Sequence, residues 1–269
     1  MLGLNRWDTT TPDSLAVDIA RGEALGYSHA LLGTNSLRLW DIYVLLALAA
    51  RQTRSIRLAP FVDNPVMRHP ATLAGSIATV DELSAGRADL VLGVADIAVR
   101  WAGQPPATVS RLEWATALTR RLLAGEPVDP GAAVPVRLEH ARPVPVWIAA
   151  GGPRTLRMAG RVADGVYLRV GRADANLRAA VAAVHAGAKE AGRTPPRSGS
   201  AWSCIRSRRA PDARLRPSPD AWPRASTSIR LCSSIARRCA GTAARYGNSA
   251  SGCGRTFTTR RTWSPRASW

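Results

Sequence analysis

Short apolar runs alternate with amphipathic segments through the first 193 residues of this chain of 269 residues. The runs have the β-branched character of strands, and the segments between them repeat apolar residues at the 3.6-residue period of a helix. Because strand and helix follow each other in regular order, the pattern predicts a parallel sheet with right-handed crossovers. Strands are expected at residues 2–7, 29–34, 56–62, 90–94, 146–150 and 166–170, and helices at 12–25, 41–54, 70–85, 109–123, 154–163 and from 174 onward.

The number of strand–helix units limits the choice of fold. A (β/α)8 barrel of the TIM type needs eight units and about 250 residues. Six units are visible here, and residues 200–205 are a candidate start of a seventh. The sequence therefore predicts an α/β chain with an incomplete (β/α)8 TIM-type barrel of six to seven units over residues 1–205. An irregular tail would follow over residues 206–269.

The composition changes abruptly after residue 196. Residues 1–196 contain 22 Lys and Arg against 17 Asp and Glu, a net charge of +5, whereas residues 197–269 contain 15 Arg against two Asp, a net charge of +13. The later segment has no Val, against 19 Val before it, and it contains all four Cys. Such a composition buries too little apolar surface to offset the entropy of ordering the chain.

Two interpretations of this tail stay open. One is a disordered basic arm that binds nucleic acid, since Arg-rich runs such as 206–209 occur among scattered Trp. The other is a lost reading frame, because 36 Arg against a single Lys indicate GC-rich coding DNA. Shifted codons in such DNA yield Arg, Ser, Pro, Ala, Cys and Trp. We favour the second interpretation, and we expect another frame of the gene, from about codon 196, to encode the missing Val- and Leu-rich units.

The cysteines and the apolar pattern exclude several classes of protein. Cys204, Cys232, Cys239 and Cys253 form no CxxC pair and have no paired His, so no metal site is predicted. The first 196 residues have no Cys, no secretory signal is visible and no apolar run is long enough to span a bilayer. We therefore expect a cytoplasmic protein without a membrane partner. Nucleic acid is not a favoured partner, because the basic charge belongs to the tail.

Two places after expected strands have residues suited to binding. Gly151 and Gly152 lie between strand 146–150 and the next helix, where backbone N–H groups and the helix dipole favour a phosphate. A plain turn is the alternative interpretation. Asp96 follows strand 90–94 at its carboxyl end, the end at which α/β proteins carry out chemistry. A helix N-cap is the alternative there.

Three segments, taken together and in order, resemble a known family. They are NPVMRHPATLAGSIATVDELSAGRA at 64–88, GVADIAVR at 93–100 and VPVWIAAGGPRTLRMAGRVADGVYL at 144–168. They are similar to the luciferase-like flavin- or deazaflavin-dependent oxidoreductases, and most of all to the branch that includes methylene-tetrahydromethanopterin reductase. The resemblance covers roughly the first three quarters of the chain. It implies a TIM-type barrel, the deazaflavin coenzyme F420 (preferred) or FMN as cofactor, and a small-molecule substrate.

The resemblance also implies which residues hold the cofactor. The turn of Ala150, Gly151 and Gly152 would bind its phosphate side. A cis peptide bond between Phe61 and Val62 would support its ring system, although the family more often has a small residue in place of Phe61. No catalytic triad is expected, because the cofactor carries the chemistry.

Further residues are implicated by the same resemblance. Asn64 would lie near the pyrimidine edge of the ring, and a turn-forming Asn before Pro is its alternative interpretation. Asp96 would hydrogen-bond the cofactor or the substrate, but the usual Gly-Asp-Ser-Ala turn reads Ala-Asp-Ile-Ala at 95–98. Thr34 and Asn35 end the second strand, where relatives commonly have an acidic residue. His69 is interpreted as a helix-start residue before Pro70 and not as a catalyst, and no role is assigned to His29, His140 or His185.

Three functions remain candidates. The first is an oxidoreductase that transfers a hydride between a reduced cofactor and a small organic substrate, or a monooxygenase that uses FMN. The second is a non-catalytic remnant, because an open barrel exposes strand edges that favour association, including a homo-oligomer. The third and weakest is nucleic-acid binding through the tail. Uptake of reduced deazaflavin or FMN would support the first, and salt-sensitive DNA binding the third.

Overall fold

A computed structural model describes residues 3–6, 11–129, 134–171 and 173–193. The chain separates into one unit at residues 1–210 and another at 211–269, and every described residue belongs to the first. The expected strand at 200–205, the predicted tail at 206–269 and all four cysteines therefore lie outside the described residues.

Strands and helices alternate through the first unit in the predicted order. The strands are β1 (Gly3–Arg6), β2 (His29–Leu32), β3 (Arg57–Pro60), β4 (Leu90–Leu92), β5 (Val146–Ala150) and β6 (Gly165–Leu168). The helices are α1 (Pro12–Ala24), α2 (Ile42–Gln52), α3 (Pro70–Ser84), α4 (Ile97–Trp101), α5 (Val109–Leu123), α6 (Pro153–Val162) and α7 (Asp174–Glu190). Only the short α4 was not predicted, since the sequence there indicated a polar connection.

All strand pairs are parallel. Hydrogen bonds join β1, β2 and β3 into one three-stranded sheet and β4, β5 and β6 into another. Two isolated parallel bridges, between Leu58 and Ala88 and between Asp63 and Leu92, connect the two sheets through β3 and β4. Within the described ranges no pairing joins β6 back to β1. The α/β class is thus confirmed, and closure into an eight-stranded barrel stays a prediction.

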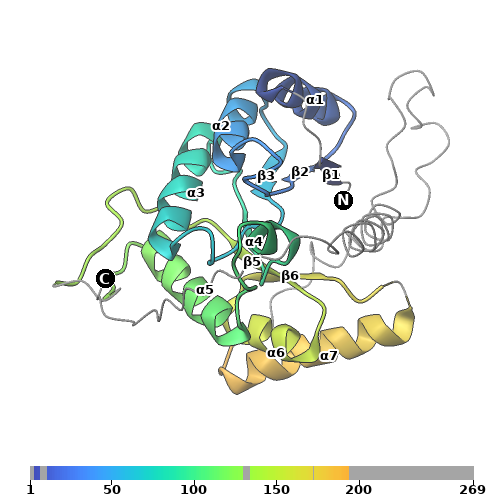
Figure 1. Ribbon diagram of the computed structural model, residues 1–269, viewed down its shortest axis with the longest axis vertical. Helices are drawn as coiled ribbons and strands as arrows, with labels where there is room; N and C mark the ends of the chain where they lie inside the picture. Colours follow the sequence, from blue (N-terminus) through green and yellow to red (C-terminus); the bar gives the residue numbers. More distant parts are fainter. Residues whose placement is uncertain (1–2, 7–10, 130–133, 172, 194–269) are drawn as a thin grey trace, which may run out of the picture. The chain divides into compact units, whose positions relative to one another are not determined.

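Helices and strands form two layers of the first unit (Figure 1). Consecutive helices pack side by side, α1 on α2, α2 on α3, α3 on α5, α5 on α6 and α6 on α7. Successive strand residues point to opposite faces of a sheet. One set of alternate residues forms a cluster of Leu31, Ala59, Val91 and Tyr167, which come from β2, β3, β4 and β6. Because residues from four of the strands meet in one cluster, these strands curve around a shared interior.

Side-chain caps explain where several helices begin. Thr11, Asp41, His69 and Thr108 each accept a hydrogen bond from a backbone N–H in the first turn of α1, α2, α3 and α5. An Asp at the start of a helix is a typical N-cap, which predicts that Asp174 caps α7, but Asp174 is the first residue of the helix and Ala173 occupies the N-cap position.

Helical spacing predicts the buried face of α3 better than that of α1. On α3, Leu73, Ile77, Val80 and Ser84 share one face at this spacing, and all four are buried. On α1, the spacing of Ala16, Ile19, Ala20 and Ala24 predicts a face of small residues, but Ala24 is exposed and the buried residues are Leu15, Ala16, Ile19 and Gly22. The sequence does not distinguish the two faces, because alanine is common on both buried and exposed sides of a helix.

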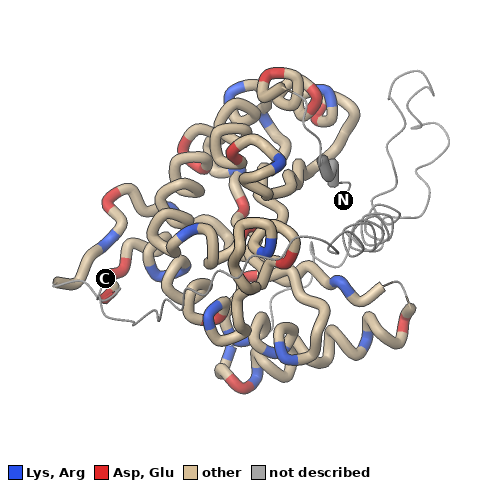
Figure 2. The backbone as a smooth tube through the Cα atoms, viewed as in Figure 1, with Lys and Arg blue, Asp and Glu red and all other residues tan. Residues whose placement is uncertain are grey.

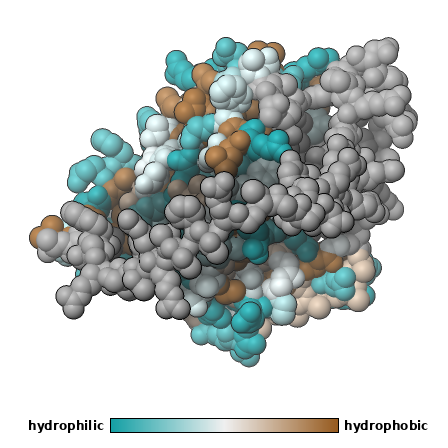
Figure 3. Space-filling model, viewed as in Figure 1, coloured by the Kyte–Doolittle hydropathy of each residue, from teal (hydrophilic) through white to brown (hydrophobic). Residues whose placement is uncertain are grey.

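Acidic and basic residues are interspersed along the described backbone (Figure 2). Apolar side chains also reach the surface among hydrophilic ones (Figure 3). No described helix combines the length and the apolar character that crossing a membrane requires.

The residue after α3 is in a strained conformation. Ala85 has φ +54°, in the left-handed region that disfavours a side chain by roughly 1–2 kcal/mol. We expect Ala85→Gly to raise the free energy of unfolding by about 0.5–1 kcal/mol, since relief of strain exceeds the entropic cost of glycine. Thermal unfolding followed by circular dichroism measures this. The same change at exposed Ala182, within α7, should lower stability by about 1 kcal/mol. A lower free energy of unfolding in both variants would contradict the strain assigned to Ala85.

Glu23 connects α1 to the start of β3. Its carboxylate accepts hydrogen bonds from the backbone N–H groups of Arg54 at 3.0 Å and Ile56 at 2.8 Å, and from the Ser55 hydroxyl at 2.7 Å. Burial opposes ionisation, but the hydrogen bonds from Ser55, Ile56 and Arg54 outweigh it and lower the pKa of Glu23 to about 2.

This pKa gives a pH-dependent prediction. Because the pKa of Glu23 is lower in the folded chain, its stabilisation is complete above the ordinary pKa of 4.5 and is lost as pH falls toward about 2. Glu23→Gln should therefore cost about 1–2 kcal/mol at pH 7 and progressively less in acid. Urea unfolding across this pH range tests it. Glu139→Gln, at an exposed site, is the control and should change little. A loss that is independent of pH would show that the charge is not responsible.

Candidate functional site

The residues predicted to hold a cofactor gather at one edge of the sheets. Parallel strands place their carboxyl ends together, and the predicted residues follow β3, β4 and β5 at those ends. A Cβ atom built on Gly93, just after β4, would lie 2.8 Å from Cγ1 of Val62 and 3.6 Å from the carbonyl oxygen of Ala149. The chain after β3 and the end of β5 are therefore in reach of each other across β4.

The peptide bond between Phe61 and Val62 is cis, as the family resemblance implied. Phe61 points toward the shared interior, where its ring meets that of Tyr167 edge to face at 5.1 Å. The hydroxyl of Thr34, from the end of β2, donates to the carbonyl oxygen of Val62. The end of β2 thus holds the backbone of the cis bond in place.

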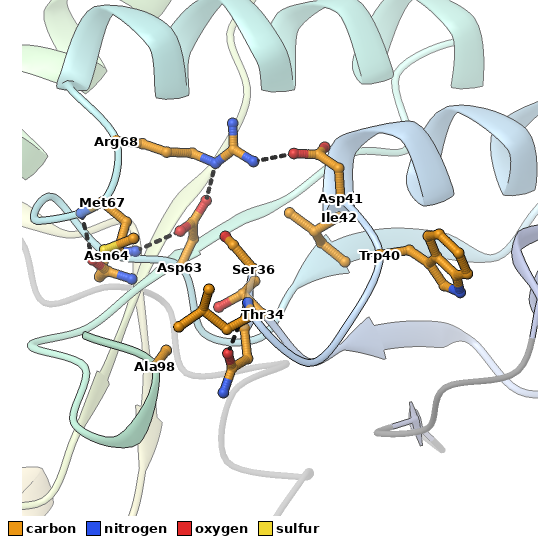
Figure 4. A pocket seen from close by; sticks show the side chains of 12 residues that line it. Thr34, Ser36, Trp40, Asp41, Ile42, Asp63, Asn64, Met67, Arg68 and Ala98 are labelled. Atoms are coloured by element: carbon orange, nitrogen blue, oxygen red, sulfur yellow. Dashed lines mark hydrogen bonds and ion pairs between the residues drawn. The ribbon is translucent and has the colours of Figure 1, made fainter. Parts of the chain in front are cut away.

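A pocket opens beside this bond, with about 440 Å³ of space that is continuous with solvent (Figure 4). It lies between the segments that follow β2 and β3, and one residue of α4 completes it. The lining residues are Thr34, Asn35, Ser36, Leu37, Trp40, Asp41, Ile42, Asp63, Asn64, Met67, Arg68 and Ala98.

A buried carboxylate stands at the centre of the polar wall of this pocket. Asp63 is only 3% exposed. Its Oδ2 accepts a hydrogen bond from the Tyr43 hydroxyl at 2.9 Å and lies 3.6 Å from Nε of Arg68, and its Oδ1 accepts from the backbone N–H of Asn64 at 2.8 Å. Arg68 also pairs with Asp41, and its guanidinium lies 4.9 Å from the centre of the Tyr43 ring. Figure 4 shows Arg68 between the two carboxylates.

Burial is the largest single influence on the pKa values of Asp63, Tyr43 and Asp41. Burial raises the pKa of Asp63, against the hydrogen bonds from Asn64 and Tyr43, which favour the ionised form. Burial, together with the nearby Asp63 carboxylate, raises the pKa of Tyr43 well above its ordinary value. For Asp41, burial is outweighed by the hydrogen bond and the charge of Arg68, which lower its pKa. Tyr43 is therefore a neutral donor at physiological pH.

Asn64 and Asp96 occupy different surroundings. Asn64 is buried and lines the pocket, while its Oδ1 accepts from the backbone N–H groups of Val66 at 3.1 Å and Met67 at 3.0 Å, so it also forms the expected turn. Asp96 stands at the N-cap position of α4 without making a side-chain cap. Its exposed carboxylate pairs with Arg100, and it does not line the pocket. Contact of either residue with a cofactor stays a prediction.

The two glycines after β5 differ from each other. A Cβ on Gly151 would lie 2.8 Å from the carbonyl oxygen of Arg169, so close packing against the end of β6 requires glycine there. A Cβ on Gly152 would have no atom within 4 Å. Gly152 is the N-cap of α6 and supplies no side-chain hydrogen bond to the first turn. The turn explanation therefore accounts for Gly151 and leaves Gly152 open to a binding role.

Sequence reasoning missed the residues that form the polar wall, namely Asp41, Tyr43, Asp63 and Arg68. Asp41 and Tyr43 were seen only as parts of a helix. Asp63 lay between a strand and an Asn-Pro turn, without a periodic pattern. The one available signal was an acidic residue directly after the predicted cis bond. The Tyr43 hydroxyl that binds Asp63 lies 20 residues away in the sequence, and no local pattern indicates such pairing.

Comparison with known proteins identifies the class to which this arrangement belongs. The luciferase-like monooxygenase family matches residues 9–224, so the chain is a member of that family, as its sequence motifs predicted. Proteins similar to it include reductases and dehydrogenases whose names state dependence on coenzyme F420. The described residues contain no cluster of His, Cys, Asp or Glu suited to a metal ion.

Individual relatives show how far the likeness extends. The 5,10-methylenetetrahydromethanopterin reductase of Methanolobus tindarius is 36% identical over 169 residues, 58% of this chain and 49% of that protein. The structure of the coenzyme F420 dependent tetrahydromethanopterin reductase from Methanopyrus kandleri has a TM-score of 0.62 and 26% identity, over 72% of this chain and 62% of the other.

A third comparison shows likeness of fold alone. The FMN complex of the oxygenating constituent of 3,6-diketocamphane monooxygenase from Pseudomonas putida has a TM-score of 0.58 at 19% identity, covering 73% of this chain and 64% of that one. The chain spans about half the length of the curated relatives it matches.

The hydroxyl of Tyr43 supplies a testable contribution to the polar wall. Tyr43→Phe removes a donor from a buried carboxylate, and we expect a loss of about 1–3 kcal/mol in the free energy of unfolding at neutral pH. The pKa of Asp63 is higher in the folded chain than its ordinary value, so stability falls as pH rises from the ordinary pKa to the folded pKa and Asp63 becomes ionised. The Tyr43 hydroxyl stabilises this ionised form. The stability lost in Tyr43→Phe should therefore become smaller in acid, where Asp63 is protonated.

Urea unfolding at several pH values measures this effect. Tyr27→Phe, at a half-buried tyrosine away from the pocket, is the matched control. Equal losses in the two variants, or a loss in Tyr43→Phe that does not change with pH, would refute the role assigned to the hydroxyl.

Proposed function

We propose that the carboxyl ends of β3, β4 and β5 bind a deazaflavin or flavin cofactor, and that the chain is an oxidoreductase acting by hydride transfer on a small organic substrate. One observation carries the proposal: the cis Phe61–Val62 bond follows β3 and the Gly151–Gly152 turn follows β5 at the same edge, and Gly93 after the intervening β4 lies close to both Val62 and Ala149. Family membership supports this interpretation. Coenzyme F420 is preferred over FMN because the similarity at residues 64–100 favours the deazaflavin branch.

The residues present fit such a cofactor. Backbone N–H groups at Gly151 and Gly152 would receive its phosphate side, where α6 has no side-chain cap and Gly152 leaves open space. Phe61 and Val62 would support the ring system. Asn64 would contact the ring edge, and Ala150 and Asp96 remain predicted neighbours of the cofactor. When bound, the cofactor would supply the hydride chemistry.

The chain's own residues would position the reactants and exclude water. The acceleration of the reaction would then come from the orientation of the bound reactants, and no acid–base pair would be needed beside the ring. Asp63 is already engaged by Tyr43 and Arg68, so we assign it a positioning role, in which it holds the wall of the pocket.

Cofactor titration tests the proposal directly. Coenzyme F420 and FMN, each in oxidised and reduced form, are titrated into the full chain while cofactor absorbance and fluorescence are followed. Saturable binding of F420, tighter than that of FMN, is the expected result. Binding of neither would favour the non-catalytic remnant. Salt-sensitive binding of DNA instead would favour the nucleic-acid alternative.

The glycine turn offers a sharper version of this test. Gly152 has φ −91° and ψ 151°, which alanine adopts without strain, so Gly152→Ala should leave stability within about 0.5 kcal/mol of the parent. Its methyl group would occupy the space proposed for the phosphate, and we expect cofactor affinity to fall about tenfold. Gly151→Ala should instead lower stability by about 1–3 kcal/mol, because its Cβ would press on the Arg169 carbonyl.

Calorimetry and cofactor titration of both variants separate packing from binding. If Gly152→Ala binds the cofactor as well as the parent does, the turn is not the phosphate site.

A further inference from the structure

We propose that the substrate of this pocket is an uncharged molecule with an aromatic or apolar body and one hydroxyl or carbonyl group. This deepens the proposed function and rests on it for the redox step. The preference for an uncharged ligand derives from the pocket alone and is testable without the cofactor. It is carried by an apolar rim and by a polar wall in which the cation, Arg68, is already neutralised.

The rim of the pocket is apolar and exposed. Leu37, Trp40 and Met67 line the pocket, and Ile97 and Trp101 flank Ala98, the residue of α4 that completes it. We call these five side chains the apolar collar. They are between 37% and 61% exposed, which is unusual for side chains of this size in one place. Trp40 is on the rim just before α2 (Figure 4). An aromatic body stacked on such a rim would bury part of it.

The two sides of the collar are connected. The guanidinium of Arg38, in the segment before α2, lies 4.7 Å from the centre of the Trp101 ring on α4. This cation–π contact links the segment that includes Leu37 and Trp40 to the helix that includes Ile97 and Trp101. The contact therefore joins two of the three segments that form the collar, and Met67, from the segment after β3, belongs to the third.

The charges of the pocket disfavour an anion. Among the lining residues, the one cation, Arg68, pairs with Asp41 and lies 3.6 Å from the carboxylate of Asp63. Two carboxylates and one guanidinium leave an excess of negative charge. A carboxylate or phosphate on the substrate would have to displace Asp41 from Arg68 or remain unpaired beside two acids.

Two further cations lie near the collar. Arg100 pairs with Asp96 within α4, whereas Arg38 stacks on the Trp101 ring and is not among the residues that line the pocket. Polar groups from the end of β2, in Thr34, Asn35 and Ser36, line one side of the pocket and suit a single hydroxyl or carbonyl. The chemistry on the wall thus matches one neutral polar group next to an apolar body.

A matched pair of probes tests the inference. 1-Phenylethanol and mandelate share a phenyl ring and a carbinol, but mandelate has a carboxylate where the other has a methyl group. Each is titrated by NMR into the full chain, with and without the cofactor. We expect 1-phenylethanol to bind at least about tenfold more tightly than mandelate in both forms.

Three variants locate the source of the preference. Trp40→Ala should weaken 1-phenylethanol binding about fivefold, whereas Trp114→Ala, a comparably exposed tryptophan on α5 outside the pocket lining, should change it less than about twofold. Asp41→Asn should strengthen mandelate binding about fivefold, because it releases Arg68 while Asn still caps α2.

The outcomes distinguish this inference from the proposed function. Mandelate binding as tightly as 1-phenylethanol, no binding of either probe, or equal effects of Trp40→Ala and Trp114→Ala would overturn the inference, whatever the cofactor titration shows. A preference for 1-phenylethanol that persists in a chain unable to bind F420 or FMN would instead uphold the pocket chemistry and refute the redox function.

Discussion

The junction between β3 and β4 is the contact on which the site depends. Among the described residues, backbone pairing between the two three-stranded sheets consists of isolated bridges, and at the carboxyl end two hydrogen bonds of the Asp63 backbone form the junction. Its N–H donates to the Val91 carbonyl at 2.9 Å, and its carbonyl accepts from Gly93 at 3.0 Å. The cis bond lies just before Asp63 and the pocket just after it. The residue that joins the sheets therefore also fixes the geometry of the candidate site, and its side chain extends that control to α2 through Tyr43.

The amino end of β3 is fixed by different means. Arg87 donates to the carbonyl oxygens of Ala50 at 3.1 Å, Thr53 at 2.9 Å and Ile56 at 2.7 Å, while Glu23 binds the backbone just before the strand. Both groups satisfy backbone atoms that a short strand would otherwise leave without partners. Charged residues thus serve stability at one end of β3, and they shape a pocket at the other. The same division of roles between the two faces is found in TIM-type barrels.

The sequence predicts the regular part of this architecture because periodicity is local. The strand at 146–150 and the helix at 109–123 were placed at their observed bounds, since a few consecutive residues determine each. The glycine turn was visible from its place between a strand and a helix, whereas the cis bond came only from the family resemblance, because no local pattern in one sequence indicates it. The Asp63 network was missed because Tyr43 lies 20 residues from Asp63 and Asp41 lies 27 residues from Arg68 in the sequence. The helix α4 was missed because five residues are too few to show a period.

Charge is distributed unevenly along the carboxyl edge, and this has a consequence for the proposed cofactor. The segments after β2 and β3 contribute Asp41 and Asp63, with Arg68 paired between them. The turn after β5 contributes backbone N–H groups of α6, and the basic Arg154 follows it by two residues. An anionic phosphate tail is favoured on the β5 side and disfavoured on the β2–β3 side. A cofactor bound across this edge would accordingly have its phosphate at the glycine turn and its ring beside the cis bond, which leaves the apolar collar for the substrate.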